Sequence, residues 1–259
     1  MPRSFSSLLI KGIEYFSLPF QYPRQFLPLL GKIFTDRPLI HELPRLTPHR
    51  AWLQQTGIRT VIDVGGFVGS FAYAVGAILP EVQIYSFEPL DGNYRQLLKN
   101  LSPRGRFQAF QTALGDRKGT LDFFQNDFSA SSSALEMADL HRRTFPKTRH
   151  QTRITVPLAR LDDYLDRMEL HPPVLLKLDV QGYEAAVLRG AVKTLQRVGY
   201  LLTEVSFQEL YAGQPLFDEI HALLTGQGFR YAGSLDSMLS PLDGSILQAD
   251  ALFTRKEKE

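Results

Sequence analysis

Apolar strand-like segments alternate with segments of helical periodicity from Arg59 to the end of the chain, and this pattern limits the possible folds more than any other feature. Repeated β–α alternation is typical of a mostly parallel sheet with helices on both faces. The last two strand-like segments follow one another without a helix, which predicts an antiparallel C-terminal edge. We therefore predict an α/β, Rossmann-like, doubly wound fold. The strand-like segments are TVIDVG, VQIYSFE, FQAFQTALG, RITVPL, PVLLKLDV, YLLTEVSF, FRYAG and ILQADALFTR, and the helical ones are SFAYAVGAIL, DGNYRQLLKNL, YEAAVLRGAVKTLQRV and LFDEIHALLTGQG.

The first 50 residues differ from the rest of the chain in their proline content. Seven of the 16 prolines lie there, and proline interrupts both helices and sheet ladders. We predict an N-terminal helical and irregular extension over residues 1–50, with a helix over Ser4–Phe16, and a single domain over residues 51–259. Two interpretations of the extension stay open. One is a lid, a dimer contact or a membrane-surface patch, and the other is a segment packed on the domain through Phe and Leu side chains.

Charge and cysteine content narrow the classes of protein. The net charge of +2 does not indicate the concentrated basic face of a nucleic-acid-binding protein. The chain has no cysteine, which excludes disulfides, thiolate metal sites and a cysteine nucleophile. No apolar stretch reaches the roughly 18 residues of a membrane-spanning helix, and Lys11 interrupts the N-terminal apolar run. We expect a cytoplasmic protein without a transmembrane segment or a nucleic-acid partner, and a homodimer is an open alternative to a monomer.

The first strand-like segment ends in the glycine-containing turn DVGGFVG, residues 63–69. In a doubly wound sheet, ligands bind beyond the carboxyl ends of the strands. Gly65 allows a sharp turn, and Gly69 lets the following helix begin close to a ligand, where its N-terminus favours electronegative groups. The spacing D-x-G-x-x-x-G differs from the G-x-G-x-x-G of dinucleotide sites. The turn therefore favours a nucleoside ligand without a pyrophosphate.

Glu88 strengthens the case for a nucleoside site. It follows Asp63 by 25 residues and ends the second strand-like segment in YSFEP. A carboxylate at that strand end can accept hydrogen bonds from both ribose hydroxyls. The structural alternative is a tight turn beside a surface glutamate.

Several motifs together resemble those of the FkbM-type methyltransferases. They are VIDVGGFVG, YSFEP, TALGD, VPLARLDDYL, LLKLDVQGYEAAVLRGA and LLTEVS, which occur in the family's order over roughly residues 58–206. The block Leu175–Ala191 is the most specific of them. The resemblance implies a class I fold with a mostly parallel seven-stranded sheet. It also implies S-adenosylmethionine as the methyl donor and transfer, usually to a hydroxyl oxygen, on natural products, sugars or glycans.

The resemblance also implies which residues bind the cofactor. In this chain Phe67 stands where the family usually has Asn, a residue that tolerates unusual backbone angles and can hydrogen-bond. We therefore expect a differently shaped turn in which Gly66 takes up the strain. Asp116 is expected to accept from the adenine amine, with a simple Gly-Asp turn as its alternative. The implied cofactor-binding residues are Asp63, Gly65, Gly66, Phe67, Gly69, Glu88, Leu114, Asp116 and Asp179.

A second group of charges follows in LLKLDVQGYE and LLTEVS. Lys177 and Asp179 lie two residues apart, so they share one face of a strand, and buried charges require partners or a function. Asp179, Glu184 and Glu204 are expected to converge beside the cofactor. Four interpretations stay open. Asp179 is a general base, it positions the cofactor's amino group, or it holds a divalent cation together with Glu204. In the fourth, the Lys177 pair is structural and Glu184 caps its helix.

Two histidines are further candidates for the base, since histidine titrates near neutral pH. His141 and His150 lie in the polar stretch 116–150, which also holds SASSSA over 129–134, a lid or a linker. We assign catalytic candidates Asp179, His141 and His150, and no metal ligands. The hypothesis is an S-adenosylmethionine-dependent O-methyltransferase whose small-molecule or glycan acceptor binds between the 116–150 stretch and the extension. A non-catalytic scaffold and an NAD-dependent oxidoreductase are the alternatives.

Overall fold

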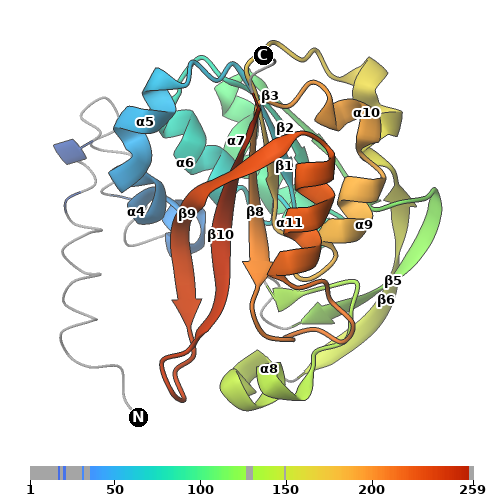
Figure 1. Ribbon diagram of the computed structural model, residues 1–259. Coiled ribbons are helices and arrows are strands. Elements are labelled where there is room, and N and C mark those ends of the chain that lie inside the picture. The colour runs from blue at the N-terminus through green and yellow to red at the C-terminus, as the bar shows by residue number, and fades with distance from the viewer. Residues whose placement is uncertain are drawn as a thin grey trace.

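The computed structural model describes residues 17, 20, 21, 31, 36–126, 131–148 and 150–256. The helix expected over Ser4–Phe16 and the first two residues of SASSSA lie outside these ranges. Figure 1 shows a central twisted sheet between two layers of helices, with a smaller sheet at one end.

The central sheet has seven strands in the order β3-β2-β1-β7-β8-β10-β9, which confirms the predicted fold. Its five parallel strands are joined at the edge by two antiparallel strands, as expected from the missing helix between them. Parallel register places Asp63 of the first strand between Ser86 and Lys177 of its neighbours. The strands are β1 (Thr60–Val64), β2 (Gln83–Phe87), β3 (Phe107–Phe110), β7 (Val174–Leu178), β8 (Tyr200–Ser206), β9 (Phe229–Leu239) and β10 (Ile246–Arg255).

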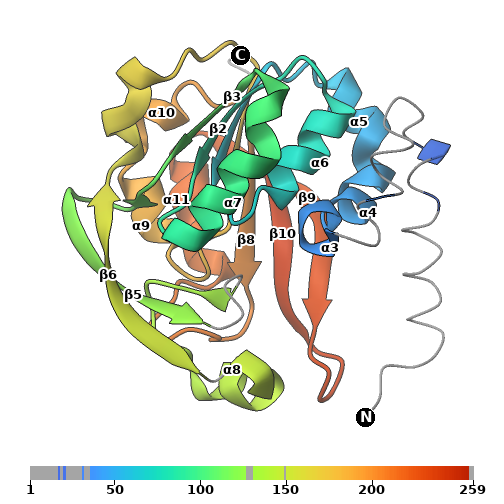
Figure 2. The ribbon, with the colours of Figure 1, turned by 180° about the vertical axis from the view of Figure 1, so that it is seen from behind.

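Helices cover both faces of the sheet (Figures 1 and 2). Alternate residues of one strand point to opposite faces, so Ile62 packs in the core beneath α9 and α11 while Val61 packs beneath α6. The first layer contains α3 (Arg37–Ile40), α4 (Leu43–Leu46), η2 (Thr47–His49), α5 (Arg50–Gln55), α6 (Ser70–Ile78), α7 (Asp91–Leu101) and η3 (Ser102–Arg104). The second contains η6 (Leu161–Arg167), α9 (Glu184–Arg189), α10 (Val192–Leu195) and α11 (Phe217–Gly226).

One predicted helix is divided in the structure. The segment YEAAVLRGAVKTLQRV forms α9 and α10 instead of a continuous helix, because α9 ends at Gly190. The backbone of Gly190 lies so close to Gly115 that a Cβ atom there would stand 1.9 Å from the Gly115 carbonyl oxygen. The close approach requires glycine at the point where the helix ends.

A second, three-stranded sheet corrects two expectations. FQAFQTALG is not one strand, because its last part forms β4 (Ala113–Leu114) in this other sheet. The stretch 116–150, expected to be the least regular, contains β5 (Gly119–Asn126), α8 (Asp139–Thr144) and η5 (Pro146–Thr148). β5 pairs antiparallel with β6 (Gln151–Ala159). Both ribbon views place β5, β6 and α8 at the end toward which β8 runs, beside the carboxyl edge of the central sheet.

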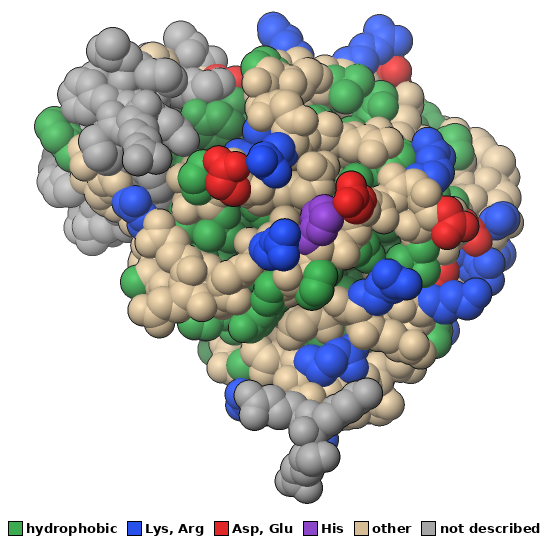
Figure 3. Space-filling view, turned by 90° about the horizontal axis from the view of Figure 1, so that it is seen from above, with side chains coloured by type: hydrophobic (Ala, Val, Ile, Leu, Met, Phe, Trp, Pro, Cys, Tyr) green, Lys and Arg blue, Asp and Glu red, His purple; other side chains and the backbone are tan. Residues whose placement is uncertain are grey.

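The extension from Asp36 onward packs on the domain, as the structural alternative expected. Ile40, Leu43 and Leu46 are buried in the same core cluster as Val61, and the Ser70 hydroxyl donates to the Pro38 carbonyl at 2.6 Å. Within the described residues, the longest apolar helices are too short to cross a bilayer. At the amino end of the parallel strands, basic side chains are scattered with acidic ones between them (Figure 3).

Candidate functional site

The glycine turn after β1 is fixed by close packing against the end of β7. Gly65 has a φ of +78°, and a Cβ atom there would stand 1.9 Å from the Asp179 carbonyl oxygen. The N–H groups of Gly65 and Gly66 both donate to the Phe87 carbonyl, at 3.0 and 2.9 Å. The turn therefore holds the ends of β1, β2 and β7 together.

The strain in this turn does not fall on Gly66, contrary to expectation. Phe67 itself adopts a φ of +50°, one of two non-glycine residues with positive φ in the described chain. Such a conformation is costly for a residue with a Cβ atom. Gly69 takes a φ of +95° and caps α6. Strained backbone of this kind clusters at ligand sites.

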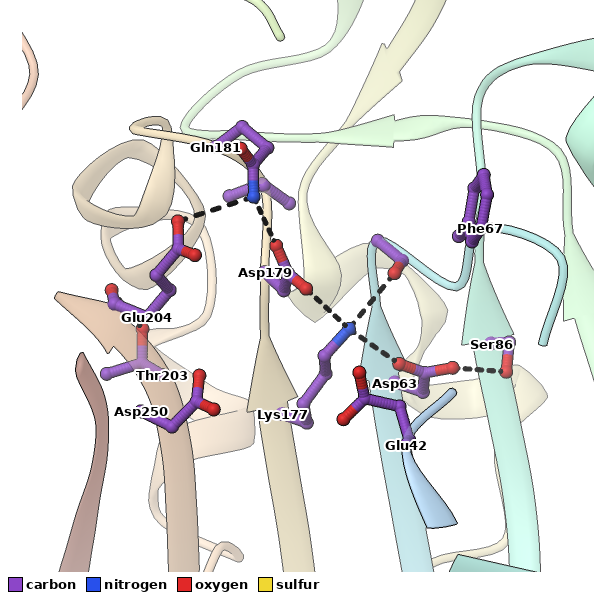
Figure 4. Close-up of polar contacts among 12 residues, drawn as sticks. Glu42, Asp63, Phe67, Ser86, Lys177, Asp179, Gln181, Thr203, Glu204 and Asp250 are labelled. Carbon is purple, nitrogen blue, oxygen red and sulfur yellow. Dashed lines mark hydrogen bonds and ion pairs between the residues drawn. The ribbon is translucent and has the colours of Figure 1, made fainter. Parts of the chain in front are cut away.

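Lys177 joins the charges at the carboxyl edge (Figure 4). Its Nζ lies 3.3 Å from Asp63 Oδ1 and 3.5 Å from Asp179 Oδ2, and it donates to the Gly65 carbonyl at 3.0 Å. Burial lowers the pKa of Lys177, but the carboxylates of Asp63, Asp179 and Glu42 together raise it above its ordinary value. The lysine is therefore charged and neutralises carboxylates from two strands. The ion pair of Lys177 and Asp179, one of the four interpretations left open, is present, with Asp63 as an additional partner.

Asp63 is completely buried at the centre of this arrangement. Its Oδ2 accepts a hydrogen bond from the Ser86 hydroxyl at 3.0 Å, and its Oδ1 faces Lys177. A buried carboxylate of this kind is stable only with such partners. Asp63 thus helps to hold the glycine turn in place.

Glu88 is turned into the protein and holds the backbone around it. Its Oε2 accepts from the Phe67 N–H at 2.9 Å, and its Oε1 accepts from Leu90 N–H at 2.9 Å and Asn93 Nδ2 at 3.2 Å. Burial raises the pKa of Glu88 to about 7 against these three donors. A carboxylate has about four acceptor positions, so one remains, on Oε2. This free acceptor position can take a hydrogen bond from one ribose hydroxyl beside the turn.

Asp179 is the open carboxylate of the site. Its side chain is 42% exposed, whereas those of Asp63 and Lys177 are 0% and 10% exposed. Gln181 Nε2 donates to Asp179 Oδ1 at 2.8 Å and to Glu204 Oε1 at 3.3 Å, so two of the three carboxylates expected to converge do so (Figure 4). Burial, followed by the charges of Asp179 and Glu184, raises the pKa of Glu204 well above its ordinary value.

Glu184 has a structural role, but it acts in the loop before its helix and not as the helix cap that one open interpretation held. Its Oε1 accepts from the N–H groups of Val180 and Gly182, at 3.1 and 3.2 Å, and so holds the loop before α9. The side chain is buried, and burial raises its pKa to about 7. It therefore shapes the loop that carries Gln181.

A small hollow, partly open to solvent, lies against Asp179. Residues of α4, α6 and the strands β7 to β10 line it, together with Glu42 and Asp179. Arg45 of α4 bonds there to Glu42 at 2.9 Å, to Asp236 at 3.0 Å and also to Asp250. The lining residues are Glu42, Arg45, Leu46, Phe71, Lys177, Leu178, Asp179, Leu202, Glu204, Leu235, Asp236 and Asp250. In the described part of the chain, no group of three or more His, Asp or Glu side chains is arranged to hold a metal ion.

The two candidate histidines lie in different surroundings. His141 is buried, its ring packs against Tyr211 and Phe145, and its Nε2 lies 3.1 Å from the Thr148 hydroxyl. Burial, with a smaller effect of Arg142, lowers its pKa to about 4. This environment keeps the imidazole neutral and away from solvent, which favours packing over proton transfer. His150 is exposed before β6.

The two residues expected near the adenine follow β3 in the chain, one in β4 and one just after it. Leu114 is buried in β4 within the main core cluster. Asp116 is partly exposed and pairs with Arg117 at 3.3 Å and Arg189 at 3.8 Å. The arginine pairing gives Asp116 a structural function that does not depend on a ligand.

Sequence reasoning missed Ser86, Gln181 and Arg45. Ser86 is signalled by its position in register beside Asp63, a hydroxyl in an otherwise apolar strand. Gln181 lies inside the quoted motif, but its extended reach to two carboxylates has no local signature. Arg45 meets Asp236 and Asp250 across 191 and 205 residues of sequence, and such pairing has no local signal.

Comparison with known proteins identifies the family. The methyltransferase FkbM domain matches residues 63–231, more than half of the chain. The protein therefore belongs to the FkbM methyltransferase family, as its motifs predicted, and this membership implies S-adenosylmethionine as the methyl donor.

Two relatives have named activities. The chain is 31% identical over 160 residues to 2-O-methyltransferase NoeI of Sinorhizobium fredii, covering 60% of this chain and 66% of that protein. It is 25% identical over 143 residues to hexuronic acid methyltransferase AglP of Haloferax volcanii, covering 55% and 54%. The chain thus spans somewhat less than two thirds of the first relative and about half of the second.

Among solved structures, the chain is similar to magnesium protoporphyrin IX methyltransferase (ChlM) from Synechocystis PCC 6803 with bound SAM. The TM-score is 0.43 at 11% identity, covering 82% of this chain and 78% of that one. Mitomycin 7-O-methyltransferase MmcR gives a TM-score of 0.45 at 14% identity, covering 93% and 60%.

The hydrogen-bond acceptors of the site fit a methyl donor that carries a nucleoside. Glu88 keeps one acceptor position beside the Phe67 N–H, and the exposed Asp179 carboxylate lies across the Gly65 turn from it. A ribose hydroxyl can donate a hydrogen bond to Glu88, and an ammonium or hydroxyl group can donate one to Asp179. The one mismatch is that Glu88 has room for a single ribose hydroxyl, not for both.

Proposed function

We propose that this protein transfers a methyl group from S-adenosylmethionine to a hydroxyl oxygen of a sugar, glycan or related natural product. Membership of the FkbM family supports methyl transfer over NAD-dependent oxidation. The name of NoeI supports transfer to an oxygen, and the name of AglP supports a saccharide acceptor. The observation that carries the proposal is the exposed Asp179, held at the carboxyl edge beside the glycine turn.

The cofactor would lie across the ends of β1, β2 and β7. Glu88 would accept one ribose hydroxyl, and the backbone of the turn, kept open by its glycines, would lie against the methionine end. Leu114 and Asp116 would flank the adenine. The full set proposed to bind it is Asp63, Gly65, Gly66, Phe67, Gly69, Glu88, Leu114, Asp116 and Asp179, in which Asp63 acts through Lys177 and the turn.

Bound S-adenosylmethionine supplies an electrophilic methyl carbon on a sulfonium, whose carbon–sulfur bond breaks as the acceptor oxygen forms the new carbon–oxygen bond. Asp179 is proposed as the base that takes the proton of the acceptor hydroxyl, a contribution of about 10²–10⁴-fold. Lys177 keeps Asp179 Oδ2 in place at 3.5 Å. Fixing the carboxylate in this way supplies part of the rate through positioning.

The hollow against Asp179 is the proposed acceptor pocket. Arg45 and Glu42 of the extension and Asp236 and Asp250 of the antiparallel edge line it, whereas no described residue of the 116–150 stretch, which was also expected to shape the acceptor pocket, does so. The charged side chains of this lining would suit the hydroxyl groups of a saccharide. The homodimer, the cytoplasmic location and the division at residue 50 stay predictions.

Methyl-labelled cofactor tests the proposal. The protein is incubated with it and with panels of mono- and oligosaccharides, and mass spectrometry then locates the label. Calorimetry measures cofactor binding in parallel, for the wild type and for Glu88→Ala. A non-catalytic scaffold, which Phe67 at the turn would favour, should show no binding. Binding without transfer to any acceptor would reject the proposed activity.

A further inference from the structure

Gln181 is the residue of the site whose conformation calls for an explanation. It lies in the loop between β7 and α9, and its φ of +53° makes it the second non-glycine residue with positive φ in the described chain. Gly182 follows with a φ of +94°. A residue with a long side chain is held in a backbone conformation that favours glycine or asparagine.

All the hydrogen-bonding groups of the Gln181 amide are engaged. The two N–H donors go to Asp179 Oδ1 at 2.8 Å and Glu204 Oε1 at 3.3 Å, and the amide oxygen accepts from the Tyr211 hydroxyl at 2.7 Å. Because the Asp179 carboxylate only accepts and the Tyr211 hydroxyl donates from the other side, the nitrogen of the amide must face Asp179. The orientation of the side chain is therefore determined by its partners.

The loop is also tied to the segment beside the small sheet. The Ser133 hydroxyl donates to the Gln181 carbonyl at 2.6 Å, and the Tyr211 hydroxyl also donates to the Ser131 carbonyl at 3.3 Å. Tyr211 is completely buried. Gln181 thus joins Asp179 to Ser133 and to the buried Tyr211.

We propose that Gln181 is a positioning residue that holds the Asp179 carboxylate in its reactive orientation; this inference rests on the proposed function. Lys177 holds Oδ2 and Gln181 holds Oδ1, so the carboxylate is tethered from both sides while 42% of the side chain stays exposed. As a neutral amide, Gln181 bridges two carboxylates without adding a third negative charge between them.

The competing explanation is that only the backbone at position 181 matters. Three variants separate the two. Gln181→Gly accepts the positive φ and removes the amide. Gln181→Glu keeps the length but replaces the two donors with a carboxylate. Tyr211→Phe keeps the ring and removes the hydroxyl that fixes the amide. Gln108→Glu, which adds the same charge at an exposed position on the distant strand β3, is the matched control.

With labelled cofactor and the best acceptor, we expect kcat to fall about 10–100-fold in Gln181→Gly and Gln181→Glu, the size typical of lost supporting interactions. Tyr211→Phe should show a smaller loss. The affinity for S-adenosylmethionine and the melting temperature of Gln181→Gly should change little, because relief of the backbone strain offsets the lost bonds. Gln108→Glu should behave as the wild type does.

The pH–rate profile gives a result that a purely structural residue would not. In Gln181→Glu, its acidic limb should move to higher pH, since an added carboxylate disfavours ionisation of the carboxylates around it. The charged and titratable groups that face Asp179 are Lys177, Asp63, Glu204, Glu184, Arg45 and Tyr211.

The outcomes distinguish this inference from the proposed function. If the wild type transfers methyl groups and Gln181→Gly keeps its kcat, the positioning role is refuted and the function stands. If Gln181→Glu lowers kcat but its pH–rate profile coincides with that of the Gln108→Glu control, the positioning role is refuted as well. If the wild type transfers to no acceptor, the proposed function fails, and the role of Gln181 with it.

Discussion

Replacing Gly65 with alanine tests whether the turn and the end of β7 are packed as closely as the structure indicates. The new Cβ atom would stand 1.9 Å from the Asp179 carbonyl oxygen, 1.5 Å short of an ordinary contact of 3.4 Å. The positive φ adds about 1–2 kcal/mol for a residue with a side chain, and overpacking adds about 1–3 kcal/mol. We therefore expect Gly65→Ala to destabilise the protein by about 2–5 kcal/mol.

Gly57→Ala is the matched control for this variant. Gly57 has a φ of +65°, but its Cβ would meet no atom within 4 Å, so only the cost of about 1–2 kcal/mol for the backbone applies. Urea unfolding of both variants measures the difference, which isolates the contact with Asp179. Equal midpoints and slopes for the two variants would refute the close approach of the turn to β7.

Three further predictions concern the same edge of the sheet. Phe67→Asn should raise the free energy of unfolding by about 1 kcal/mol, and with it the urea midpoint, because asparagine tolerates the φ of +50°. A lower midpoint would mean that the phenyl ring contributes more stability than the strain costs. Lys177→Met should destabilise the protein by about 3–5 kcal/mol, because it leaves Asp63 buried without a cation. The control Lys99→Met, at an exposed position, should change the stability by no more than about 0.5 kcal/mol. Similar losses of stability in the two variants would contradict the ion pair. Glu88 has a pKa of about 7 when folded against an ordinary 4.5, so the folded state binds the proton more tightly and stability falls as pH rises through this window, by about 2–3 kcal/mol between pH 5 and 8. Urea unfolding of wild type and Glu88→Gln across that range should give a flatter curve for the variant, and parallel curves would show that Glu88 does not titrate there.

Local patterns were sufficient for the central sheet and its turn. β1, β2, β7 and β8 are mainly apolar runs bounded by turn residues, and α6 and α7 have helical spacing, so each element carries its own signal. The pairing of Lys177 with Asp179 could be predicted because strand period alone places them on one face. The glycine spacing and Glu88 located the turn for the same reason, since each lies at a strand end.

What the sequence did not predict depends on contacts between distant segments. β5 alternates exposed and partly buried residues, with Leu121 and Phe123 inward, but its polar composition concealed this period, and only its partner β6 makes it a strand. Sequence reasoning placed the strain on Gly66 because glycine usually takes it. The structure places it on Phe67, whose N–H is held by Glu88 from another strand.

The carboxyl edge of the sheet behaves as one unit because a single cation contacts the ends of both β1 and β7. Lys177 of β7 contacts Asp63 of β1, the Gly65 carbonyl of the turn and Asp179. The Ser86 hydroxyl of β2 donates a further hydrogen bond to Asp63. A shift of the turn would therefore move Asp179, the proposed base, as well, and the two parts of the proposed site keep a fixed separation. This coupling explains why the chain tolerates a phenylalanine at the turn: Lys177 and Glu88 hold the backbone there, so the side chain at position 67 does not have to.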